Sequence, residues 1–197
     1  MEQIWWERVP NALLFTSEIV DRLLGERSII LQCPGDFPWY YYMVRNIKEA
    51  VKQQNSSKRF ECVSGVSEPG PYLLREFCKP EKRAEYRPAK TYARFFAESD
   101  DIVLHERYVW VKICSKEQLD SWIKFVSEYT KERGKDKNVA VFVLEWRESG
   151  SIQTKKGIKL CSFDEYVTEY DRIVFCTLAS SSVKECSFMK NYLTELA

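Results

Sequence analysis

Short apolar runs alternate with longer amphipathic segments along most of this chain. The runs at residues 29–31, 59–63, 108–113, 138–144 and 171–178 are typical of strands, and several are apolar enough to be covered on both faces of a sheet. Between them, apolar residues spaced three and four apart predict helices that pack along one face. The alternation predicts an α/β domain, a three-layer sandwich with helices on both faces of a mostly parallel five-stranded sheet.

The segment 28–51 organises this prediction. Its apolar run ends at Pro34, Gly35 and Asp36, which break the chain, and an amphipathic helix then extends to residue 51. The loop that follows the first strand of a parallel sheet lies at the carboxyl edge, where ligands usually bind and where helix N-termini attract anions. We therefore expect any small-molecule site of this chain to include Pro34, Gly35 and Asp36.

Local signals predict where the other helices begin and end. Thr16 or Ser17 is expected to cap the first helix, and Gly25 to end it in a left-handed conformation. Ser115 and Gln118 form a capping box ahead of a regular amphipathic helix.

A second capping box, Ser162 with Glu165, predicts a short helix that ends near residue 170. The polar stretch 149–159 before it is expected to be an exposed loop or a small hairpin. The last helix keeps its apolar spacing to residue 197 without a stop signal, so we expect the single α/β domain at 1–197 to be the N-terminal part of a longer protein.

Composition narrows the classes of function. The 197 residues are 45% hydrophobic and carry a formal net charge of +1, so the chain is globular and has no global field that would favour nucleic acid. The apolar runs are too short to cross a bilayer, and the acidic start lacks a signal core, which together favour a cytoplasmic protein without a membrane anchor. Seven cysteines without a C-x-x-C pair indicate reduced thiols, most of them packed in the core.

The order of elements resembles that of P-loop NTPase domains of the AAA+ or STAND kind. This resemblance implies a phosphate-binding loop after the first strand, with the motif G-x-x-x-x-G-K-[ST]. The matching residues 33–42 read CPGDFPWYYY, with one glycine, no lysine and an aspartate that would repel phosphate. The family's magnesium-binding acid is expected after the third strand, but YVWVKICS has none, and Glu145 follows the fourth strand instead.

The resemblance therefore implies a degenerate domain that has lost both halves of NTP chemistry. The leading hypothesis is a regulatory or protein-interaction module inside a larger protein, without catalysis of its own, in which Pro34, Gly35, Asp36 and Glu145 line any residual cleft. Its partners would be other domains or subunits. An alternative is an enzyme or nucleotide-binding switch with an unorthodox loop, in which Asp36 and Glu145 serve as metal ligands or general bases.

A third hypothesis comes from the basic and aromatic segment 79–94, which fits a nucleic-acid-associated scaffold. The basic residues that would contact nucleic acid are Lys82, Arg83, Arg87, Lys90 and Arg94. The competing interpretation is a solvated, partly helical excursion between two strands, which the balanced net charge favours.

The sequence contains few of the residues that a metal site or a cofactor site needs. His105 is the only histidine, which excludes mechanisms and zinc sites that need two imidazoles. The first turn lacks the glycines of a dinucleotide-binding fingerprint. Neither a metal ion nor a cofactor is therefore expected.

Overall fold

The computed structural model describes residues 10–33, 40–84, 91–98, 104, 106–133 and 139–166, and the structural statements below concern these residues. The described elements, in chain order, are α2 (Pro10–Leu24), β1 (Ile29–Gln32), α3 (Tyr40–Gln54), β2 (Arg59–Ser64), α4 (Pro69–Phe77), α5 (Pro80–Arg83), α6 (Tyr92–Glu98), β3 (Arg107–Lys112), α7 (Lys116–Glu132), β4 (Val141–Trp146), β5 (Lys159–Ser162) and the 3-10 helix η1 (Phe163–Glu165).

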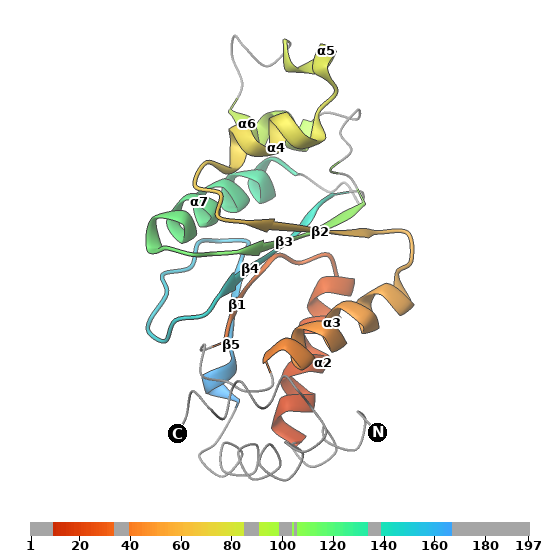
Figure 1. Ribbon diagram of the computed structural model, residues 1–197, viewed down its shortest axis with the longest axis vertical. Coiled ribbons are helices and arrows are strands. Elements are labelled where there is room, and N and C mark those ends of the chain that lie inside the picture. The colour runs from red at the N-terminus through yellow and green to blue at the C-terminus, as the bar shows by residue number, and fades with distance from the viewer. Residues whose placement is uncertain are drawn as a thin grey trace.

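The described strands form one parallel sheet of five, in the order β2-β3-β4-β1-β5 (Figure 1). Every residue of β1 and β4 is buried, whereas β2 at the outside is mostly exposed or half-buried. The continuous apolar runs of β1 and β4 thus occupy the centre of the sheet, as a strand covered on both faces requires. The predicted α/β fold with a parallel sheet is confirmed.

Helices cover both faces of this sheet. α2 and α3 lie on one face, and α4, α6 and α7 lie on the other (Figure 1). Each face has its own apolar cluster, with Met43 and Ile47 of α3 in the first and Trp122 and Val126 of α7 in the second. Alternate residues of each strand contribute to the two clusters, so the described elements form three layers.

The fifth strand differs from the prediction. β5 begins at Lys159, the last residue of the segment expected to be a polar loop, and runs to Ser162, where a helix was expected to begin. The strand expected at 171–178 lies outside the described residues. The short helix expected to begin at Ser162 is the single turn η1, and the Ser162 side chain does not cap it. β5 was missed because only Leu160 and Cys161 are apolar among its four residues, and pairing with β1 holds them in the sheet.

The first helix also differs at both ends. α2 begins at Pro10, so Thr16 and Ser17 lie within the helix instead of capping it. Its left-handed residue is Glu26 (φ 56°), not Gly25. The Arg27 N–H donates to the Arg22 carbonyl (2.9 Å) and the Glu26 N–H to that of Leu23 (3.0 Å). These two bonds define a Schellman motif with Glu26 at the position that glycine usually occupies.

The helix predicted after the first capping box is confirmed as α7. The Ser115 hydroxyl accepts a hydrogen bond from the Gln118 N–H at 3.3 Å. No helix in the described part of the chain combines the length and the apolar composition that crossing a membrane requires.

Candidate functional site

A topological switch point lies between the carboxyl ends of β1 and β4. The chain leaves β1 toward α3 on one face of the sheet. After β4 it runs along the α7 face, where the Ser127 hydroxyl donates to the Lys156 carbonyl (3.2 Å) and Ile158 packs into the α7 cluster. Because adjacent strands send their connections to opposite faces here, this is the place in an open α/β sheet where ligands usually bind.

Glu145 projects into this switch point and is almost completely buried, with 3% of its surface exposed. It follows Val141 and Val143 at intervals of two, so its side chain lies on the α2 and α3 face of β4. Its Oε2 atom accepts a hydrogen bond of 2.5 Å from the indole Nε1 of Trp110 in β3. A neutral indole is thus the hydrogen-bond donor to this buried carboxylate.

The indole of Trp110 also contacts a cation. The Nζ of Lys48 in α3 lies 4.7 Å from the centre of the ring, and 3.5 Å from the Cys62 sulfur. Trp110 itself is fully buried, so Lys48 covers the outer face of the tryptophan that holds Glu145.

Tyr40, the first residue of α3, brings a hydroxyl to the same carboxylate. This side chain is only 2% exposed, and its hydroxyl forms no hydrogen bond of normal geometry with the described residues. Burial is the main cause that raises the pKa of Tyr40 far above its usual value. The Glu145 carboxylate adds to it through its negative charge and through a hydrogen-bonding interaction that falls short of normal geometry. The Arg147 guanidinium, 4.6 Å from the ring centre, acts in the opposite direction. Tyr40 therefore remains a neutral phenol at physiological pH.

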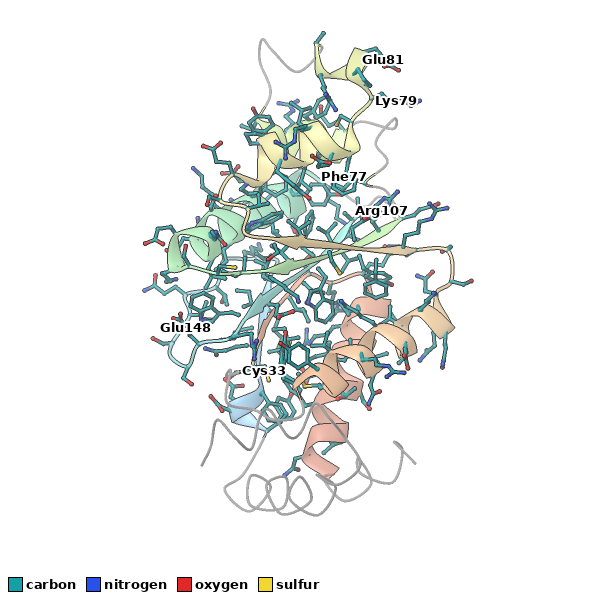
Figure 2. The ribbon with its side chains drawn as sticks, viewed as in Figure 1. Cys33, Phe77, Lys79, Glu81, Arg107 and Glu148 are labelled. Carbon is teal, nitrogen blue, oxygen red and sulfur yellow. The ribbon has the colours of Figure 1, made fainter. Side chains whose placement is uncertain are left out.

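Backbone and amide bonds fix the two strand ends around this cluster. The Cys33 N–H donates to the Trp146 carbonyl at 3.0 Å, which continues the ladder by one residue. The Gln32 amide donates to the carbonyls of Glu148 and Gly150, both at 2.8 Å. Figure 2 shows Cys33 and Glu148 on this side of the sheet, away from Arg107 at the opposite end. The segment after β4 is therefore tied to the end of β1.

The predicted cleft residues are only partly described. Glu145 lies at the carboxyl end of β4, whereas Pro34, Gly35 and Asp36 fall outside the described residues, so a cleft lined by these four residues stays a prediction. Within the described ranges, no three His, Cys, Asp or Glu side chains come together in a way that could hold a metal ion.

Two neighbours of Glu145 were missed by sequence reasoning. Trp110 lies on another strand, so nothing local in the sequence pairs it with Glu145. Tyr40 belongs to the stretch 33–42, which was compared with the phosphate-loop motif and not with Glu145. Its position at the start of the helix after the first strand was the one available signal.

The basic segment is only partly described. Arg83 in α5 is half-buried and donates to the Arg75 carbonyl, and Arg94 in α6 is paired with Glu98 at 2.8 Å. The side chain of Lys82 and the residues Arg87 and Lys90 fall outside the described set. Arg83 and Arg94 thus make local contacts, and a nucleic-acid surface stays a prediction.

Known proteins give no match for this chain: no protein-family model, no curated protein and no solved structure matches it. The features on which a function can be based are the parallel sheet, with its order β2-β3-β4-β1-β5, and the switch point between β1 and β4.

Proposed function

We propose that this chain is a non-catalytic regulatory or protein-interaction module of a larger protein, with the architecture of a degenerate P-loop NTPase domain. The observation that carries the proposal is the hydrogen bond between Trp110 and Glu145 at the switch point. Through it, the carboxylate that comes nearest to a catalytic position is engaged in internal packing.

A carboxylate that binds a metal ion or removes a proton must present an oxygen to the ligand. One oxygen of Glu145 is held at 2.5 Å by a fully buried indole, and the whole side chain is 3% exposed. A hydrogen bond to a charged group contributes about 1.5–3 kcal/mol, so a ligand would have to replace that bond before it could use the oxygen. Internal packing is the better-supported role.

The order of elements adds support. Between residues 10 and 166 the chain runs through a helix, a buried central strand, a long helix directly after it, and four further parallel strands. This is the order on which the resemblance to AAA+ and STAND domains rests. The stretch 33–42, which takes the place of the phosphate loop, has one glycine and no lysine.

A nucleotide-binding switch is the second candidate, and the Tyr40 hydroxyl favours it. A buried phenol without a hydrogen bond of normal geometry is a donor that a ligand at the switch point could use. In that case Tyr40 and Glu145 would contact the ligand side by side.

A thermal-shift titration with ATP, ADP and GTP, with and without magnesium, separates the two candidates. A ligand that binds only the folded state at 100 times its Kd stabilises it by about 2.7 kcal/mol, which is a readily measured rise in Tm. We expect no rise at millimolar nucleotide.

A saturable rise that disappears in Tyr40→Phe or Glu145→Gln, but persists in the exposed control Glu148→Gln, would instead establish the nucleotide switch. The control matches the second variant in chemistry and lies three residues away on the surface.

A further inference from the structure

Among the described residues, no strand pairs with the outer edge of β2, so its outward-facing backbone groups are available to another strand. The Arg59 N–H donates to the Glu106 carbonyl at 3.0 Å, so Arg59, and with it Glu61 and Val63, directs its backbone groups toward β3. The alternate residues Phe60 and Cys62 therefore direct theirs away from the sheet, as does Ser64 at the end of β2. In the described part of the chain, β2 pairs with β3 alone.

The same edge is accessible. Cys62 and Ser64 are exposed, and Phe60 is half-buried. β2 has six residues, against four in β1 and β5. An edge strand of this length with unpaired N–H and C=O groups is a template for the addition of one more strand.

We propose that the strand it accepts is β2 of a second copy of this chain, paired antiparallel about a two-fold axis that passes through Cys62. The outward-facing residues are symmetric about Cys62, so Phe60 of each copy meets Ser64 of the other, and Cys62 meets Cys62. Each such pair exchanges two backbone hydrogen bonds, which gives about six across the axis. The two sheets then form one continuous sheet, an isologous interface.

The charge pattern of β2 favours this register over the one centred on Glu61. In the proposed register, Glu61 faces Val63 of the second copy and Arg59 faces Gly65, so no like charges are opposed. Gly65 has φ 69°, with nothing within 4 Å of the place a Cβ would take, and so leaves room for the arginine. A shift that moves the axis to Glu61 would oppose two glutamates and use fewer of the outward-facing groups.

The proposed dimer also brings two like charges toward each other. Lys48 lies beside the Cys62 sulfur on the α3 side, and the axis brings the Lys48 of the second copy toward it. Its ammonium is drawn back over the ring of Trp110, and salt screens exposed charges of this kind. The dimer should therefore persist, or strengthen, as the salt concentration rises.

The proposed dimer names a partner for the interaction module proposed above, and in this respect it rests on that proposal. The module and the dimer can nevertheless be contradicted separately. A nucleotide-induced rise in Tm would contradict the non-catalytic module and leave the dimer intact, whereas a strictly monomeric chain without nucleotide binding would contradict only the dimer.

Proline substitutions test the edge directly by analytical ultracentrifugation of the full chain. Proline is tolerated in an edge strand where its missing N–H would face outward. Cys62→Pro and Ser64→Pro should keep the fold by circular dichroism yet sediment as monomers, at concentrations where the unmodified chain forms dimers. Glu61→Pro removes an N–H that points at β3 and should lower Tm strongly, which confirms the direction of the bonds.

Cross-linking locates the axis. In a chain with Cys114, Cys176 and Cys186 replaced by serine, Cys62 is the exposed thiol, since Cys33, Cys78 and Cys161 are buried. A short bismaleimide, to whose two double bonds one Cys62 thiol of each copy adds, spans the gap between a hydrogen-bonded pair of residues and should give a covalent dimer on a reducing gel. Adding Cys62→Ser should abolish that dimer.

Two results would overturn the proposal: a chain that stays monomeric up to about 1 mM, or a dimer that survives in a folded Cys62→Pro or Ser64→Pro variant. If both proline variants unfold, the cross-linking experiment decides alone, because an unmodified dimer that gives no Cys62 cross-link contradicts the register.

Discussion

A glutamate lies at each end of the strands, half-buried Glu26 at the amino edge of the sheet and buried Glu145 at the carboxyl edge, and the two have different partners. At the amino edge, the Glu26 carboxylate accepts from Lys58 Nζ (2.6 Å) and from Arg133 Nη2 (3.3 Å). At the carboxyl edge, Glu145 accepts from the neutral indole of Trp110. The negative charge of Glu26 is therefore compensated by two cations at hydrogen-bond distance, whereas the hydrogen-bond donor to Glu145 is uncharged.

The amino-edge cluster connects four elements. Glu26 follows α2, Lys58 precedes β2, and Arg133 follows α7. The Lys58 ammonium also donates to the Val139 carbonyl, two residues before β4 (3.3 Å). The Arg133 guanidinium donates to the Glu26 carbonyl as well, at 2.8 Å. The comparison shows that this chain uses charge to stabilise the fold at the amino edge. At the carboxyl edge it keeps a carboxylate next to a phenol whose hydroxyl makes no hydrogen bond of normal geometry with the described residues.

The largest expected effect is the loss of the Glu26 carboxylate. Glu26→Gln leaves the Lys58 ammonium, 5% exposed, without its anion, and we expect a loss of about 3 kcal/mol in the free energy of unfolding, measured by urea denaturation. The exposed pair Arg45 and Glu49 supplies the control, and Glu49→Gln should change it by less than about 0.5 kcal/mol. Equal effects would mean that the amino-edge cluster is not special.

Next in size is the loss of the indole donor at the carboxyl edge. Trp110→Phe leaves the Glu145 oxygen buried without that bond, which should cost about 2 kcal/mol or more. The same substitution in a Glu145→Gln background should cost about 1 kcal/mol less, because no charge is then left unbonded. Identical costs in both backgrounds would show that packing, not the hydrogen bond, holds this edge together.

Two glutamates have a left-handed backbone, which costs about 0.5–1 kcal/mol at each, and they allow a matched test of this strain. Glu106 (φ 62°) is exposed, so Glu106→Gly should relieve its backbone and raise Tm. Glu26→Gly relieves the same conformation but removes the carboxylate of the cluster, and should lower Tm. If both variants were stabilised, the ion pairs of Glu26 would contribute less than its backbone strain costs.

Tyr40→Phe should change the free energy of unfolding by less than about 0.5 kcal/mol, because the hydroxyl it removes makes no hydrogen bond of normal geometry with the described residues. A loss well above 1 kcal/mol, by urea denaturation, would show that the hydroxyl has a hydrogen-bond partner. The second result would remove the observation that favours a ligand at the switch point.

The smallest effect is a pH dependence at the amino edge. The hydrogen bond from Lys159 (2.8 Å), followed by that from Arg22, holds the pKa of Glu18 below its ordinary value. A carboxylate with a depressed pKa stabilises the fold above its unfolded pKa of 4.5, and the contribution is lost as the pH falls through the folded value. Urea denaturation between pH 6 and about 3 should lose a few tenths of a kcal/mol less in Glu18→Gln than in the unmodified chain. An unchanged pH profile in this variant would contradict the ion pair.

The parts of the fold that follow local rules were predictable. Apolar runs gave β1 and β4, and the capping box gave the start of α7. Features set by distant residues were not. Glu26 takes the left-handed position because Lys58 and Arg133, 32 and 107 residues away, bind its carboxylate. In the same way, the position of Glu145 at a strand end was predictable, but its hydrogen bond from the indole of Trp110 in the neighbouring strand was not.

Because the amino-edge ion pairs join the ends of α2 and α7 to the starts of β2 and β4, the fold has an anchor remote from the loops that leave the carboxyl ends of the strands. Such an arrangement suits loop engineering. A library confined to the exposed residues 153–155 would leave the Glu26 cluster and the contacts of Gln32, Ser127 and Ile158 untouched, so new binding loops could be selected on this scaffold with little loss of foldable members.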